Sequence, residues 1–198
     1  MRILILSSPR CGSSALTRAL SRALNYKEYQ EPYNKFWGSK YRKQNADIFE
    51  DNCVVKLITY EKSPGYEGST LSFLLEFIKQ FDRVIFLDRK DFTAQLESYS
   101  FMRQHRYKGD WQARYIYNED TNLDFDNYYL SLLKDIVLFL SNQSKKSITY
   151  YEDIFSNNPE LVESTLGKSG INVKYEDLRP YIDSKYKLRV EKKDIDII

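Results

Sequence analysis

The chain has 198 residues and nearly balanced charge, with 30 Lys and Arg against 28 Asp and Glu, so a large nucleic-acid footprint is not indicated. Its two cysteines, Cys11 and Cys53, are too few for a disulfide framework and favour a reduced, cytoplasmic setting. The opening apolar run ends at Ser7, which is too short for a signal-peptide core, and no later run approaches the length of a membrane span. We expect one domain over residues 1–198.

Short apolar runs alternate with helical spacings along the chain. Strands are predicted at 3–7, 25–31, 53–58, 83–87 and 147–151, and helices at 13–24, 71–78, 91–105, 129–140 and 159–170. Three stretches lack a clear period: 33–51, interpreted as a helix or lid, 107–122, interpreted as a loop, and the charged tail from 173, for which we predict no structure. The alternation predicts a three-layer α/β/α fold with a mainly parallel sheet, which binds ligands beyond the carboxyl ends of its strands.

The polar turn between the first strand and the first helix has the features of an anion site. A glycine turn that leads into a helix presents unpaired amide groups and the positive end of the helix dipole. Arg10 adds a fixed positive charge, and Ser13 or Ser14 is predicted to cap the helix. The turn is not a Walker P-loop, because Ser7 stands where the first glycine belongs and no lysine follows Gly12. It is not a phosphatase loop either, because the residue six positions after Cys11 is Thr17 rather than arginine.

The turn sequence Pro9-Arg10-Cys11-Gly12-Ser13-Ser14 resembles the 5′-phosphosulfate loop of sulfotransferases that use 3′-phosphoadenosine 5′-phosphosulfate (PAPS). A second segment, with Arg89, Asp91, Gln95 and Ser98 in the pattern R-x-D-x-x-x-Q-x-x-S, resembles the 3′-phosphate-binding segment of the same family. Its spacing is most similar to the trehalose sulfotransferase branch. Further likeness lies in Gly109-x-Trp111 and in Tyr151-Glu152-Asp153-Ile154, so the resemblance runs through residues 3–166 with gaps.

This resemblance implies a P-loop-like sulfotransferase fold, the cofactor PAPS with its product PAP, and a small-molecule or carbohydrate hydroxyl as acceptor. It implies that the 5′ end of the nucleotide is held by Arg10, Cys11, Gly12, Ser13 and Ser14. It places the 3′-phosphate on Arg89 and Ser98. For Arg89 and Asp91 the plain alternative is a salt bridge at a surface helix cap, worth at most about 1 kcal/mol.

Sulfuryl transfer needs aligned partners, stabilisation of the charge that develops on the leaving oxygen, and removal of the acceptor's proton. Arg10 is the candidate for stabilising the leaving-group charge. The resemblance implies that Lys56, alone in an apolar strand, lies beside the transferred sulfuryl group, although it could also be an edge-strand lysine that opposes aggregation. Many family members carry a histidine two residues after this lysine, where the chain has Ile58. The trehalose branch instead implies Glu31 as the base, and a solvated turn glutamate is the alternative. His105, the single histidine, is a candidate by residue type only.

The aromatic residues Tyr33, Trp37 and Trp111 lie in or beside the irregular stretches and could stack on a flat acceptor, although core packing explains single aromatic residues equally well. No cluster of metal-ligating residues has the required spacing, so we expect no metal. Two other functions stay open. One is a P-loop-like nucleotide kinase in which residues 84–88 act as a Walker B strand, and the other is an inactive protein that only binds PAP.

Overall fold

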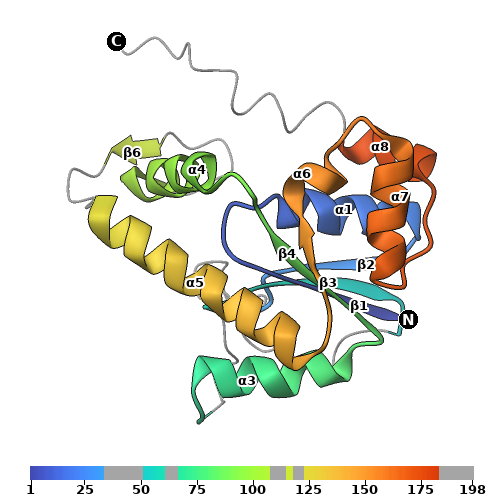
Figure 1. Ribbon diagram of the computed structural model, residues 1–198, viewed down its shortest axis with the longest axis horizontal. Coiled ribbons are helices and arrows are strands. Elements are labelled where there is room, and N and C mark those ends of the chain that lie inside the picture. The colour runs from blue at the N-terminus through green and yellow to red at the C-terminus, as the bar shows by residue number, and fades with distance from the viewer. Residues whose placement is uncertain (34–50, 61–66, 108–114, 118–122, 183–198) are drawn as a thin grey trace.

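A computed structural model describes residues 1–33, 51–60, 67–107, 115–117 and 123–182, with the backbone alone at 102–107 and 115–117. At its centre is a five-stranded sheet in which every strand pair is parallel, in the order β2-β3-β1-β4-β7 (Figure 1). The strands are β1 Arg2–Ser7, β2 Lys27–Gln30, β3 Cys53–Ile58, β4 Arg83–Asp88 and β7 Ile148–Tyr150. The predicted parallel sheet is confirmed, and each predicted strand is present with small shifts of its ends.

Helices cover both faces of the sheet, which makes three layers (Figure 1). One face carries α1 Ser13–Ala23, α7 Pro159–Lys168 and α8 Tyr175–Ile182, and the other carries α3 Thr70–Phe77 and α5 Leu123–Gln143. The remaining helices are α4 Phe92–Gln104, the short α6 Tyr151–Ile154 and a 3-10 turn, η2 Ile78–Gln80. The α/β/α prediction is therefore confirmed. Among the described helices, none is long and apolar enough to cross a membrane.

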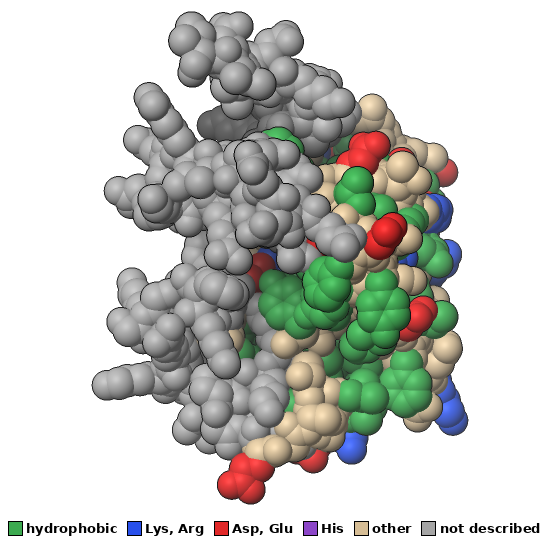
Figure 2. All heavy atoms as spheres, turned by 90° about the vertical axis from the view of Figure 1, so that its left-hand side faces the viewer, with side chains coloured by type: hydrophobic (Ala, Val, Ile, Leu, Met, Phe, Trp, Pro, Cys, Tyr) green, Lys and Arg blue, Asp and Glu red, His purple; other side chains and the backbone are tan. Residues whose placement is uncertain are grey.

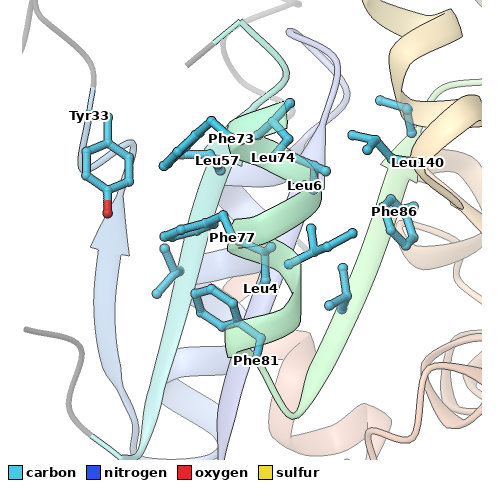
Figure 3. Packing of buried hydrophobic residues seen from close by; sticks show 14 of the residues in the cluster. Leu4, Leu6, Tyr33, Leu57, Phe73, Leu74, Phe77, Phe81, Phe86 and Leu140 are labelled. Atoms are coloured by element: carbon cyan, nitrogen blue, oxygen red, sulfur yellow. The ribbon is translucent and has the colours of Figure 1, made fainter. Parts of the chain in front are cut away.

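The two hydrophobic clusters follow from the two-residue period of the strands. In β1, Leu4 and Leu6 point into the cluster under α3 and α5, whereas Ile3 and Ile5 point into the cluster under α1, α7 and α8. Both clusters are closed to solvent, which explains why β1 is apolar without interruption. Figure 3 shows how α3 places an aromatic row, which includes Phe77, against Leu4 and Leu6.

The strand order determines where a ligand can bind. The chain passes from β1 to β2 and β3 on one side, and then to β4 and β7 on the other. The carboxyl end of β1 is therefore the point at which the direction of winding reverses. In open parallel sheets, the crevice at such a point is where ligands bind. The turn that follows Ser7 begins there.

Two segments differ from the prediction. The stretch 107–122, predicted as a loop, contains the strand β6 Tyr115–Tyr117, which pairs antiparallel with β5 His105–Tyr107 at the end of the predicted helix 91–105; both strands are too short to show a period. In the tail, for which no structure was predicted, residues 175–182 form α8, whose Tyr175, Leu178 and Ile182 pack into the cluster with α1. Charged neighbours and an internal proline hide this helical spacing in the sequence. The single-domain prediction stays a prediction, since residues 183–198 lie outside the described part.

Helix α5 carries apolar side chains on its outer face as well as on its core face. Leu133, Val137 and Leu140 are buried, whereas Phe125, Tyr128 and Leu132 are exposed. Figure 2 views the side of the molecule on which α4 and the beginning of α5 lie in Figure 1, and hydrophobic side chains gather there. The outer apolar residues of α5 are therefore not explained by the packing of the described core.

Candidate functional site

The turn after β1 adopts left-handed backbone at Arg10, with φ 64°, and at Gly12, with φ 77°. Gly12 is the N-cap of α1, which begins at Ser13, and no side chain among the described residues caps it. The predicted serine cap is therefore wrong, because Ser13 and Ser14 lie inside the first turn of the helix. The carbonyl of Gly12 accepts the amides of Ala15 and Leu16, at 3.0 and 3.1 Å. Within the described residues, the amides of Gly12, Ser13 and Ser14 have no backbone acceptor, so this helix end can receive an anion.

Gly12 is also a point of close approach. A Cβ at this position would lie 2.5 Å from Cδ2 of Tyr151 and 2.9 Å from Cε2 of Phe155. These two rings, from α6 and the residue after it, stack with their centroids 4.5 Å apart. The positive φ and the short distance both require glycine at this position. The two rings thereby pack directly against the backbone of the turn at Gly12.

Cys11 contributes to the fold of the turn rather than to its surface. Its side chain is fully buried, and its thiol donates to the carbonyl oxygen of Ser8 over 2.9 Å. Burial raises the pKa of the thiol from the usual 9.0 to about 11. The side chain is therefore neutral at physiological pH and is directed into the protein interior rather than toward solvent.

Lys56 lies in the interior of the sheet, because β3 runs between β2 and β1. Its side chain is 5% exposed, so the edge-strand interpretation is wrong. The ammonium donates to Ser14 Oγ over 2.7 Å and forms an ion pair with Glu31. Glu31 follows β2 with φ 47°, and its side chain is 12% exposed, so it is not a solvated turn residue. A lysine and a carboxylate are thus held together beside the first turn of α1.

The segment after β4 is organised by α6. Glu152 accepts the amides of Lys90 at 3.0 Å and Asp91 at 3.2 Å, and Lys90 Nζ binds Asp153 Oδ1 at 2.6 Å. Asp91 caps α4 through the amide of Ala94, as predicted. These contacts fix the backbone at the beginning of α4.

Arg89 does not form the surface pair with Asp91 that was considered as an alternative. Its guanidinium carbon lies 5.1 Å from the ring centroid of Tyr151, and its Nε is 3.8 Å from Glu152 Oε1. That Nε is buried, and among the described residues it has no hydrogen-bond acceptor. It is therefore a donor that a bound anion can satisfy.

Hydrogen bonds join the two segments that resemble the nucleotide-binding motifs. Arg10 Nε donates to Ser98 Oγ over 2.9 Å, so Ser98 meets the first segment directly. Ser8 Oγ donates to Asp88 Oδ1 over 2.9 Å, and Gln95 Nε2 donates to Ser8 Oγ and to the Pro9 carbonyl over 2.8 and 2.7 Å. The turn after β1 and the segment from β4 into α4 therefore form one structural unit.

Sequence reasoning missed several residues of this unit. Lys134 of α5 binds Asp88 Oδ2 at 2.9 Å, yet in the sequence it is one polar residue of an amphipathic helix and carries no signal. Ser8 and Asp88 follow or end apolar strands, which was an available hint. Tyr151 and Glu152 belong to a stretch that was noted for its resemblance but had no role assigned to it.

The predicted acceptor residues are placed only in part. The ring of Tyr33 is buried and packs edge-on against Phe73 and Phe77, so it is committed to the core, and we leave it out of the acceptor site. Trp37 and Trp111 lie outside the described residues, as does the side chain of His105. Among the described residues, no three His, Cys, Asp or Glu side chains gather as a metal ion would need.

The arrangement combines cations, hydroxyls and helix amides at the carboxyl edge of the sheet, with the carboxylates of Glu31, Asp88 and Glu152 among them. Such a set suits a ligand with several negative charges and a nearby group that loses a proton. No protein-family model matches the chain, and no curated protein matches it either, so the likeness to sulfotransferases depends on the motifs quoted above.

We expect Gly12→Ala to lower the free energy of unfolding by about 2 kcal/mol or more, because the left-handed backbone costs about 1–2 kcal/mol and the ring of Tyr151 must also move. Gly167→Ala is the control, since its Cβ would meet nothing within 4 Å inside α7. That change should be neutral or stabilising by up to about 1 kcal/mol. Urea unfolding of both variants measures the difference, and equal effects would contradict the close approach at Gly12.

We expect the stability of the protein to fall between pH 9 and pH 11 through Cys11. The folded state keeps this thiol protonated up to about pH 11, whereas the unfolded chain releases the proton near 9.0, so rising pH favours unfolding. The contribution is about 2–3 kcal/mol. Urea unfolding of the wild type and of Cys11→Ser across this range isolates it, because other titrating groups cancel in the difference. A difference that stays constant with pH would contradict the raised pKa.

Proposed function

We propose that the protein is a PAPS-dependent sulfotransferase, which moves a sulfuryl group to a hydroxyl of a small-molecule or carbohydrate acceptor. The hydrogen bond between Arg10 and Ser98 carries this proposal. Arg10 belongs to the segment that resembles the 5′-phosphosulfate loop, and Ser98 to the segment that resembles the 3′-phosphate site. Their contact supports a single site that spans both ends of one nucleotide.

The side chains present fit the chemistry of such a nucleotide. At the 5′ end, Arg10, Lys56, Ser14 and the first amides of α1 are donors to anionic oxygens. At the 3′ end, Arg89 has a buried Nε without an acceptor among the described residues. When bound, PAPS supplies the sulfuryl group together with a phosphate leaving group.

Glu31 is the proposed general base. Its carboxylate is held by Lys56 at the edge of the site, where an ionised carboxylate can take the proton of the acceptor hydroxyl. Lys56 and Arg10 are proposed to stabilise the negative charge on the leaving oxygen, which is the largest electrostatic demand of the reaction. Lys56 contacts both the proposed base, Glu31, and Ser14 in the first turn of α1.

The two alternative functions differ in what they require. A kinase with Asp88 as its Walker B carboxylate needs that group available for a metal-bound water, but both its oxygens are bonded, to Ser8 and to Lys134. For the alternative of a protein that only binds PAP, no feature of the described residues favours binding without catalysis. Turnover with an acceptor distinguishes it from the enzyme.

We also propose a cytoplasmic location. Both cysteines are free and buried, so neither supports the fold through a disulfide. A reduced compartment suits such a chain.

We expect wild-type protein to bind PAP, and Arg10→Ala and Arg89→Ala each to weaken that binding by roughly 10- to 100-fold. The reason is that each change removes charge-assisted hydrogen bonds to a phosphate. Isothermal titration calorimetry measures the affinities. Arg22→Ala, which removes an exposed arginine from the last turn of α1, is the matched control and should bind as the wild type does. Absence of PAP binding by the wild type would overturn the proposed function.

We expect Glu31→Gln to bind PAP within about threefold of the wild type but to lower kcat roughly a hundred- to ten-thousand-fold, because glutamine keeps the shape and loses the base. Transfer of labelled sulfuryl groups from PAPS to a panel of sugars and small alcohols measures the rate. Glu76→Gln, an exposed position on α3, is the control. A wild type that binds PAP but sulfates nothing favours the binding-only alternative, and normal turnover by Glu31→Gln removes this residue from the mechanism.

A further inference from the structure

Lys134 uses every donor of its ammonium group at the junction between β4 and α4. Its Nζ lies 2.9 Å from Asp88 Oδ2, 2.7 Å from the carbonyl oxygen of Arg89 and 3.1 Å from Gln95 Oε1. An ammonium has three donors and no acceptor, so these three partners satisfy it. Its side chain is 20% exposed, and it comes from α5, an element that neither nucleotide-binding motif includes.

The partners of Lys134 reach both halves of the site. Asp88 and Gln95 both bind Ser8, and Gln95 also binds the carbonyl of Pro9, the residue before Arg10. The third partner is the backbone of Arg89 itself. One hydrogen bond therefore links Lys134 to the backbone of Arg89. Two successive hydrogen bonds, through Gln95, link it to the carbonyl of Pro9, which precedes Arg10.

We infer that Lys134 is a positioning residue, which holds the turn of Arg10 and the segment of Arg89 at one spacing and thereby selects nucleotides that carry both a 5′ and a 3′ anion. The selection of nucleotides rests on the proposed function, whereas the holding of the two segments does not. Without the ammonium, Asp88 loses its counter-charge, and Gln95 Oε1 and the Arg89 carbonyl each lose a donor. The segment of Arg89 then moves relative to the turn, while the direct contacts within the turn are kept.

The test uses Lys134→Met. The control is Lys79→Met, the same substitution at an exposed lysine in η2. A third protein, Asp88→Asn with Lys134→Met, removes the unpaired buried charge and so guards against simple failure to fold. It does not restore the bonds to Arg89 and Gln95. Each protein is titrated with PAP and with adenosine 5′-phosphate, which lacks the 3′ group, and hydrogen exchange of residues 89–98 is measured without nucleotide.

We expect Lys134→Met and the double variant to lose PAP affinity by about tenfold or more, the effect of one charge-assisted hydrogen bond, with adenosine 5′-phosphate binding changed less than about threefold. Exchange in 89–98 should be faster in both than in Lys79→Met. A variant that keeps both the wild-type preference for PAP and slow exchange overturns the inference and leaves the proposed function standing. If the wild type binds no PAP, the proposed function is wrong, and the hydrogen exchange alone decides whether Lys134 holds the two segments.

Discussion

The hydrogen-bonded contact between the turn after β1 and the segment after β4 is the constraint on which the site depends. It follows from sheet register, because β1 and β4 are parallel neighbours in which Ser7 pairs with Leu87. Ser8, the residue after β1, and Asp88, the last residue of β4, therefore lie side by side and bind each other. Removing one partner of a buried charge pair such as Asp88 and Lys134 costs about 3–5 kcal/mol, whereas apolar replacement of both is often neutral. We infer that the cluster serves geometry more than stability.

The other side of β1 follows the same physical logic. In β3, Val54 and Lys56 share the face that α1 covers, because side chains alternate along a strand. A lysine inside a sheet must be paired, and the beginning of α1 with the end of β2 provides Ser14 and Glu31. Lys56 thus contributes positive charge at the first turn of α1, which follows the turn that carries Arg10. A cationic helix end bordered by one carboxylate is the arrangement that the proposed sulfuryl transfer uses.

The short helix α6 contacts both the turn after β1 and the segment after β4. Tyr151 packs on Gly12 and lies under Arg89, and Glu152 binds the amides that begin α4. The stretch Tyr151–Ile154, which resembles the sulfotransferases, therefore has a structural role that the motif alone does not reveal. It keeps the turn and the arginine against one aromatic surface, and the proposed 5′ and 3′ sites share this support.

The sequence by itself determined the elements and the local chemistry: five strands, the helices between them, the glycine turn after the first strand and the Asp91 cap, because each depends on residues only a few positions apart. It also singled out Arg10, Glu31 and Arg89, which follow strands, and Lys56 within one. Tertiary structure alone decided which side chains meet. Lys56 and Ser14 are 42 positions apart, and Arg10 and Ser98 are 88 apart. Such contacts depend on strand register and helix packing, which no local period encodes, and Lys134 escaped prediction for the same reason. The helix α8 was missed because charged neighbours and a proline hide its spacing, and β5 and β6 because each has only three residues.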